Sequence, residues 1–343
     1  MNRTALLAST TLALGLAAPA AMAQGTITFT SFGGAFQDAQ REALLAPTAE
    51  ALGITILEDT LTGIAEVRAQ VLAGAVTWDI VDLGLADCAA AQAEGILEPL
   101  DYSIISTEGF DPAAYSDAWA GIIYFSTVLA HDADLFGENA PQSWADFWDV
   151  EGFPGARSLR NNPVSTLEIA LLADGVPVDE IYPLDLDRAF AKMEEIRDHI
   201  DVWWTSGAQS AQLIADGEVD MISIWNGRLD AVVADGINAG YTYNQGIASL
   251  DCLAIPRGAP NKDLAMQALA MMLAPEQQAQ MPQYINYGPT TALAFDMGVI
   301  TPEQTEISPS APDNLAVQLI TNADYWAENR QHVQERWDAF MTR

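Results

Sequence analysis

The feature that most constrains the fold of this chain is a regular alternation of short β-rich runs with longer helical stretches. Three strands are predicted at 27–31, 54–57 and 79–83, and a segment with helical character follows each of them. This rhythm is typical of βαβ units, which build a mostly parallel sheet covered by helices. The sequence therefore predicts the α/β class.

The alternation continues after a long apolar run at 121–129, which we expect to carry the chain into a second lobe. Ser143 is placed to cap a short aromatic helix, and Asn261 to cap a helical stretch up to Met281. The sequence contains no internal repeat and no linker rich in proline and glycine, so we expect two lobes that share the chain discontinuously. Further strands are predicted at 157–160, 202–204, 219–225 and 250–255, and further helices near 167–172, at 186–200, near 213–214 and at 321–341.

Residues 1–23 have the pattern of a secretory signal peptide. Arg3 supplies a positive charge, residues 5–18 are uncharged, and Ala21-Met22-Ala23 forms a small-x-small cleavage site. The apolar run is shorter than the ~20 residues that a membrane-spanning helix needs. No cysteine follows the cleavage site, so a lipid anchor is not expected. We expect a soluble protein exported to the periplasm.

The charge of the chain is strongly negative. It has 47 Asp and Glu against 14 Lys and Arg, for a formal net charge of −33. Such a surface repels polyphosphate, so nucleic acid is not an expected partner, and an anionic membrane is disfavoured for the same reason. The acidity does not by itself identify a cationic ligand, because a solubilising surface explains it as well.

Signals for an enzyme are absent from the sequence. The three histidines, His131, His199 and His332, have no acidic or cysteine neighbours at metal-ligand spacing. No nucleophile elbow, zinc-protease motif, phosphate loop or dinucleotide fingerprint occurs. We therefore predict no catalytic residue, metal or cofactor. A secreted hydrolase stays open as the alternative from another class, and a carboxyl pair ~5–10 Å apart in a deep groove would favour it.

Candidate binding residues lie at the ends of predicted strands. Ser31-Phe32-Gly33-Gly34 follows the first strand, where open α/β sheets place ligands. The two glycines let a ligand approach the backbone at a helix N-terminus, and a tight turn that needs small residues is an equal explanation. Trp225 ends a later strand and Tyr287 lies in a polar break, although each of these aromatics could simply pack.

Asp251 is the most informative single residue. It interrupts the apolar run at 250–256, where a carboxylate is costly unless it is paired or hydrogen-bonded. The ammonium group of a ligand is one partner that would compensate this cost. An internal arginine is the other.

These residues together resemble the spermidine/putrescine-type (polyamine) periplasmic substrate-binding proteins of ABC transporters, within the bacterial extracellular solute-binding family. The similarity extends over nearly the whole mature chain, and the order and spacing of its motifs are specific. The motifs are Ser31-Phe32-Gly33-Gly34, TWDIV at 77–81, SWAD at 143–146, DGEV at 216–219, WNG at 225–227, LDCLAIP at 250–256, GAPN at 258–261 and YGPT at 287–290.

The resemblance implies a two-lobed periplasmic binding protein of the type II-like class, with central mixed sheets and a ligand cleft that closes by hinge motion. Residues 24–120 plus 248–305 would form lobe 1 and residues 121–247 lobe 2, while helices in 306–343 brace the lobes. The protein would act as a monomer, deliver its ligand to ABC-transporter permease subunits and catalyse no reaction.

The resemblance also assigns roles to individual residues. Trp225 falls where the family stacks an aromatic on the ligand, Asp251 where a carboxylate holds an ammonium, and Tyr287 where a phenol lines the cleft. Phe32, beside Gly33 and Gly34, replaces a tryptophan common after the first strand. Asn162 and Ser165 fall where the family has carboxylates, and Ser249 replaces an aromatic.

The neutral Asn162 and Ser165 remove charged partners from one end of a long dication. Polyamine remains the first prediction on family grounds, and the alternative is an ω-amino acid such as γ-aminobutyrate, whose carboxylate Arg160 or Arg228 would meet. Ferric iron, held by clustered tyrosines in related proteins, ranks below both, because Tyr284 and Tyr287 are the only close pair near the expected cleft.

Cys88 and Cys252 are the only cysteines, in a compartment that permits disulfides. Two unrelated buried thiols are the alternative. In the implied fold the segment after the third strand neighbours the strand that re-enters lobe 1, so we predict that the two residues are bridged.

Overall fold

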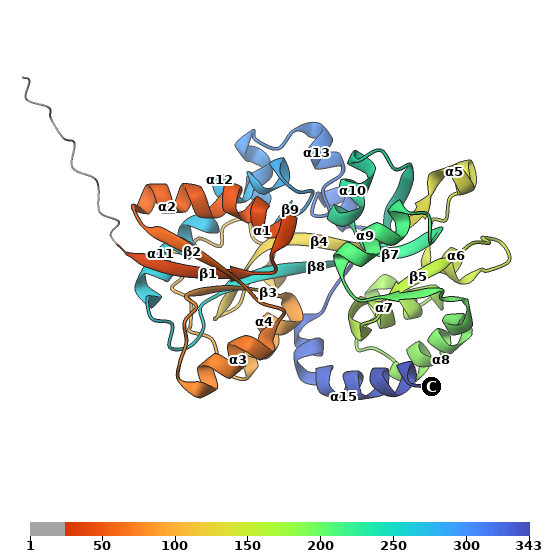
Figure 1. The fold of residues 1–343 in the computed structure, drawn as a ribbon, viewed down its shortest axis with the longest axis horizontal. Coiled ribbons are helices and arrows are strands. Elements are labelled where there is room, and N and C mark those ends of the chain that lie inside the picture. Colours follow the sequence, from red (N-terminus) through yellow and green to blue (C-terminus); the bar gives the residue numbers. More distant parts are fainter. Residues whose placement is uncertain (1–24) are drawn as a thin grey trace, which may run out of the picture.

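The computed structural model describes residues 25–343, and the predicted signal peptide at 1–23 lies outside the described residues (Figure 1). The strands form one mixed sheet in the order β2-β1-β3-β8-β4-β7-β5-β6, with β10 added beside β8 and β9 beside β4. The strands are β1 (Thr26–Ser31), β2 (Thr55–Thr60), β3 (Ile80–Gly84), β4 (Trp119–Asp132), β5 (Arg157–Arg160), β6 (Val202–Trp204), β7 (Met221–Trp225), β8 (Ala239–Ala254), β9 (Gly288–Pro289) and β10 (Leu319–Ile320).

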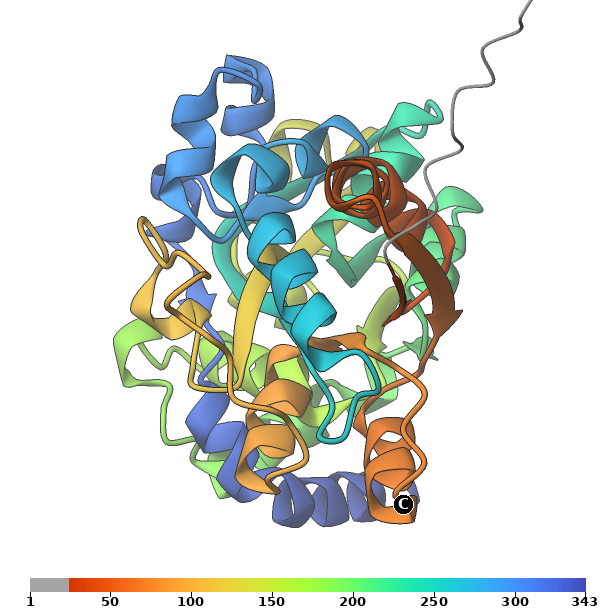
Figure 2. The ribbon, with the colours of Figure 1, turned by 90° about the vertical axis from the view of Figure 1, so that its left-hand side faces the viewer.

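Helices cover both halves of this sheet (Figure 2). Most follow the strand before them directly, as the alternation in the sequence predicts. The α-helices are α1 (Gly34–Gln40), α2 (Ala46–Leu52), α3 (Ile64–Ala73), α4 (Leu85–Ala93), α5 (Ala133–Phe136), α6 (Trp144–Trp148), α7 (Pro163–Ala173), α8 (Leu186–Ile196), α9 (Gly207–Ala215), α10 (Asn226–Ala234), α11 (Lys262–Met272), α12 (Pro275–Gln278), α13 (Pro302–Glu306), α14 (Pro312–Leu315) and α15 (Ala323–Met341).

The outer strand pairs are parallel and the centre is antiparallel. β1 pairs in parallel with β2 and β3, and β5 with β6 and β7. β4 and β8 pair antiparallel along most of their length and pass through the centre of the molecule (Figure 1). Their register shifts between Thr127 and Leu129, opposite a stretch of β8 in which Gln245 has a φ of 59°. The two halves of the sheet are therefore joined by these two long strands.

The hydrophobic clusters show which segments pack together. Ile27 and Phe29 of β1 share a cluster with Leu253 of β8 and Leu269 of α11. A separate cluster combines Leu159 of β5 with residues of α7 and α8 and with four residues of α15. Segments 25–120 and 248–305 thus share a core, as the lobe 1 prediction requires, while the lobe boundaries themselves stay a prediction.

The last helix, α15, joins parts of the chain that are distant in sequence. Trp326, Val333 and Trp337 are buried in the cluster with β5 and α7. On another side of the helix, Arg330 forms an ion pair with Asp87 of α4. In Figure 1, α15 starts near the middle of the molecule and runs along the lower edge of the half that contains β5 and α8.

Three sequence predictions of local structure were wrong. The predicted helix up to Met281 breaks after Met272, because Pro275 starts a new short helix, α12. Asn261 precedes α11 but its side chain does not cap it. The side-chain amide instead donates to Asp79 at 3.2 Å. In addition, β8 begins eleven residues before the predicted strand at 250–255, since its first part is polar and is held by pairing with β4.

Cys88 of α4 and Cys252 of β8 are joined by a disulfide, with their Cα atoms 6.7 Å apart. Both side chains are fully buried in a cluster with Leu83 and Trp119. The bridge ties α4 to the strand that carries Asp251. Within residues 25–343, no helix has the length and apolar character to cross a membrane.

Candidate functional site

Aromatic side chains from four elements meet beside the two central strands. Trp225 ends β7, and its ring lies 6.0 Å from that of Phe125 in β4 and 5.4 Å from that of Trp204 in β6. Tyr287 precedes β9 and lies 6.1 Å from Phe125. A Cβ added at Gly227 would lie 2.6 Å from the Tyr287 ring, so glycine is required there. The structure thus places two predicted site residues, Trp225 and Tyr287, on either side of Phe125.

Asp251 lies in β8, directly opposite Gly84 of β3 and Ile123 of β4. Its side chain is 9% exposed. Among residues 25–343 no group donates a hydrogen bond or ion pair to its carboxylate, so the internal arginine offered as an alternative is not there. Burial, and then the nearby Asp82 and Asp87, raises the pKa of Asp251 well above its usual value. A buried carboxyl group of this kind is neutralised either by a proton or by a cation from outside the described residues.

Asp82 of β3 is a neighbour of Asp251 that sequence reasoning missed. It is fully buried and accepts hydrogen bonds at Oδ2 from Ser31 Oγ (3.1 Å) and Gln40 Nε2 (2.5 Å). Burial raises its pKa to about 7. The signal was available, since Asp82 interrupts an apolar strand in the same way as Asp251 does.

Two arginines supply positive charge near the aromatic group. Arg160 ends β5, and its guanidinium carbon lies 4.9 Å from the centre of the Trp225 ring and 5.6 Å from that of Trp204. No carboxylate within the described range 25–343 forms an ion pair with Arg160, and burial lowers its pKa to about 10. Nε of Arg228, in α10, is buried without a hydrogen-bond partner in the same part of the chain.

Charged side chains of both signs affect the pKa of the Tyr287 phenol. Burial raises the pKa of Tyr287, Arg228 lowers it, and Asp251 and Asp230 raise it. The phenol therefore lies within electrostatic reach of both the cationic and the anionic side chains.

The Ser31–Gly34 segment has the geometry of a tight turn. Gly33 and Gly34 have φ values of 70° and 61°, which favour glycine. The Gly33 N–H donates to Gln37 Oε1 at 3.0 Å, so it is already occupied within the protein. Phe32 is 39% exposed and makes no ring contact with Trp225 or Tyr287 in the part of the chain that the structure describes. The turn explanation therefore accounts for both glycines.

Asn162 and Ser165 lie at the start of α7, just after Arg160. Asn162 caps the helix, since its Oδ1 accepts from the Val164 N–H at 2.9 Å. Ser165 is buried and has a φ of 72° inside a kink, a conformation that costs energy for a residue with a side chain. Neither residue brings a charge to the site. The charge near this position comes from Arg160.

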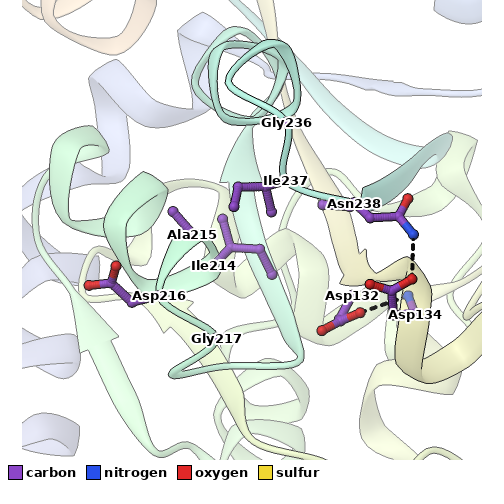
Figure 3. Close-up of a pocket in the computed structure, with 10 residues that line it drawn as sticks. Asp132, Asp134, Ile214, Ala215, Asp216, Gly217, Gly236, Ile237 and Asn238 are labelled. Carbon is purple, nitrogen blue, oxygen red and sulfur yellow. Dashed lines mark hydrogen bonds between the residues drawn. The ribbon is translucent and has the colours of Figure 1, made fainter.

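A surface pocket of about 380 Å³ lies elsewhere, between β4, α9 and the start of β8 (Figure 3). Its carboxylates have structural roles. Asp132 caps α5 by accepting from the Asp134 and Leu135 N–H groups, and Asp134 accepts from Asn238 at 2.6 Å. None of the predicted binding residues lines this pocket. It is not the candidate site.

This geometry does not support the two remaining alternatives, a ferric iron site and a hydrolase active site. Tyr284 is 54% exposed whereas Tyr287 is 6% exposed, so the two tyrosines do not form an equivalent pair for ferric iron. Residues 25–343 contain no cluster of three His, Cys, Asp or Glu side chains that could hold a metal. Asp82 is fully buried, so it cannot act on a glycosidic bond together with Asp251.

Comparison with known proteins identifies the family. The family model for bacterial extracellular solute-binding proteins matches residues 43–306. The γ-aminobutyric acid-binding protein of Pseudomonas aeruginosa is 34% identical over 96% of this chain and 95% of its own length. An ABC-transporter substrate-binding protein from Bradyrhizobium japonicum superposes with a TM-score of 0.90 at 45% identity, over 93% of this chain and all of that one. A structure described as a GABA receptor has a TM-score of 0.85 at 37% identity, over 92% and 97%.

The chain belongs to the bacterial extracellular solute-binding family and has the periplasmic binding protein fold. Its role is that of the substrate-binding protein of an ABC transporter, and proteins of this kind are not enzymes. The spermidine/putrescine-binding periplasmic protein of Escherichia coli is more distant, at 25% identity over 68% of this chain and 67% of that protein.

Proposed function

We propose that this protein captures an ω-amino acid of the γ-aminobutyrate class in the periplasm and delivers it to an ABC-importer permease. The observation that carries the proposal is the pair of uncompensated charges at the aromatic group, the carboxylate of Asp251 and the guanidinium of Arg160. A zwitterion with its charges at opposite ends satisfies both. The identity to a γ-aminobutyric acid-binding protein over nearly the whole chain supports the same ligand class.

A polyamine fits this arrangement less well than our first prediction assumed. Putrescine and spermidine bring a cation to each end, and Arg160 and Arg228 would repel one of them. Neutral Asn162 and Ser165 offer no carboxylate in compensation. The ω-amino acid alternative is therefore the better supported of the two.

Calorimetric titration with γ-aminobutyrate, putrescine and butylamine tests the proposal. We expect γ-aminobutyrate to bind most tightly. Arg160→Met should weaken γ-aminobutyrate by about ten- to a hundredfold, since hydrogen bonds to charged groups contribute ~1.5–3 kcal/mol, and should leave butylamine unaffected. Arg336→Met is the matched control, because Arg336 lies 4.8 Å over the Phe190 ring and pairs with Asp187. Tighter binding of putrescine than of γ-aminobutyrate would contradict the proposal.

The lobes proposed above, 24–120 plus 248–305 and 121–247, should close around the ligand by bending at β4 and β8. The register shift near Thr127 and the strained Gln245 mark where these strands depart from regular pairing. We expect the X-ray scattering curve to change on adding saturating γ-aminobutyrate. Superimposable curves with and without ligand would contradict closure.

A further inference from the structure

We infer that Asp82 is a positioning residue for the amine end of the site, and that Asp82 and Asp251 form a carboxyl pair from which the ligand ammonium displaces a proton. The inference rests on the proposed function and deepens it. It makes capture of the amine a proton-coupled event. It assigns Asp82 an effect that is exerted through Asp251, since Asp82 itself is fully buried.

The strand register places the two side chains on one face of the sheet. Asp82 of β3 lies opposite Leu253 of β8, and Gly84 lies opposite Asp251. Directly opposed residues share a face and so do residues two apart along a strand, which makes Asp82 and Asp251 diagonal neighbours. The Asp251 carboxylate leans toward β3, because a Cβ added at Gly84 would lie 3.7 Å from its Oδ1.

The hydrogen bonds of the pair are incomplete in a way that suits a shared proton. Ser31 and Gln40 both donate to Oδ2 of Asp82, while Oδ1 is buried without a partner. Across residues 25–343 no group donates a hydrogen bond to the Asp251 carboxyl. Two adjacent carboxyl groups in an apolar site do not both ionise readily, so one proton is held by the pair as a unit.

Charged groups on the neighbouring elements do not replace that proton. Asp87 of α4 adds negative charge, but its carboxylate is already paired with Arg330 of α15. Arg228 of α10 lies near Tyr287, which itself stays neutral because burial raises its pKa. Asp230, also in α10, accepts from the side-chain amide of Asn286. The positive charge that faces the pair therefore has to come from the ligand.

The step balances in atoms and charge. A singly protonated pair and a ligand ammonium combine to give two carboxylates, the bound ammonium and one proton released to solvent. No covalent bond to carbon changes. Because the complex holds fewer protons than its separated parts, the affinity should rise by up to about tenfold per pH unit until the free pair is fully ionised.

Calorimetry in buffers of different ionisation enthalpy measures the released protons directly. At slightly acidic pH we expect the wild-type heat of γ-aminobutyrate binding to vary with the buffer, with a slope approaching one proton per ligand. Asp82→Asn keeps the shape of the side chain but removes a charge that raises the pKa of Asp251, while burial still raises it. This variant should therefore still bind, with a smaller slope at this pH and with the rise in affinity displaced to lower pH. Asp79→Asn, a buried carboxyl on the opposite face of the same segment, is the matched control and should keep the wild-type slope.

A wild-type heat that does not depend on the buffer, or an unchanged slope in Asp82→Asn, would overturn the inference. If γ-aminobutyrate does not bind at all, the proposed function fails, and the pair is then tested in the ligand-free protein. In a Glu168→Gln background, which removes another buried carboxyl, the infrared band of a protonated carboxyl should be present at neutral pH and should weaken in both Asp82→Asn and Asp251→Asn, because each variant removes one carboxyl of the pair. Absence of the band from the background protein would overturn the inference separately.

Discussion

Glu168 in α7 and Asp251 in β8 are both buried acids surrounded by aromatic and apolar residues, and they differ in what donates to them. Glu168 Oε1 accepts from Tyr182 Oη and from Trp326 Nε1, each at 2.7 Å. The Asp251 carboxyl accepts no hydrogen bond from any group within residues 25–343. The first acid is part of a joint between α7 and α15. The hydrogen-bond donors around a buried acid, and not its burial, therefore distinguish a structural carboxyl from one that is available to a ligand.

The largest effect on stability should come from removing the carboxylate of Glu168. Glu168→Leu leaves Tyr182 and Trp326 as buried donors without an acceptor, at a cost of about 1–3 kcal/mol for each. The free energy of unfolding, measured by denaturant titration, should fall by the sum of these two costs. The affinity for γ-aminobutyrate should be unchanged in the protein that remains folded, and a large loss of affinity would undermine the distinction between the two acids.

The opposite pattern should follow from Asp251→Asn. We expect γ-aminobutyrate to bind about ten- to more than a hundredfold more weakly, since a hydrogen bond to a charged group contributes ~1.5–3 kcal/mol. The melting temperature of the ligand-free protein should not fall, because a buried and uncompensated charge has been removed. Unchanged calorimetric affinity together with a lower melting temperature would make Asp251 a structural acid like Glu168.

Trp225→Ala should have a smaller effect, and at the opposite end of the ligand. The sequence predicts that this ring stacks on the amine, but in the structure it lies against the guanidinium of Arg160. Cation–π contacts contribute ~0.5–2 kcal/mol, so removing the ring should loosen Arg160 and weaken γ-aminobutyrate several-fold. Butylamine, which lacks a carboxylate, should be affected less. An equal loss for both ligands would return Trp225 to the amine end.

Glu168 and Asp82 should also make the ligand-free protein less stable as the pH rises, at no more than about 1.4 kcal/mol per pH unit for each group. Burial raises the pKa of Glu168 from 4.5 to about 7 and that of Asp82 from 3.8 to about 7. A raised pKa stabilises the fold below the unfolded value, and this contribution is lost as the pH rises through the folded value. Melting temperatures between pH 5 and 8 should therefore decline, less steeply in Glu168→Gln and in Asp82→Asn. Equal slopes in all three proteins would contradict this assignment.

Much of the fold was predictable because its signals are local. The strands at 27–31 and 79–83 and the Ser143 cap follow from periodicity and from side chains that bond to their own backbone. The first part of β8 could not be found in this way. Its residues at 239–246 include no aliphatic residue larger than Ala239, and pairing with β4 makes this segment part of the strand.

The site was predictable to the extent that a residue stands out against its own segment. Asp251 and Trp225 were selected as candidates in this way, and Asp82 carries the same signal. Arg160 is different, since nothing in its own strand distinguishes it from a surface arginine. Its position against Trp225 and Trp204 depends on β5 lying beside β6 and β7 in the sheet.

The sequence by itself determined the α/β class, the expected export signal and the presence of a costly acid at 251, because periodicity, composition and local interruptions of apolar runs are properties of short segments. Only the tertiary structure decided whether that acid has a donor, that Arg160 forms no ion pair within residues 25–343, and that Phe32 stands apart from Trp225 and Tyr287. These outcomes depend on contacts between residues far apart in the chain, such as Gly84 and Asp251, whose geometry is set by strand order and register. The free energy of a buried charge depends on such neighbours, and no local pattern contains them.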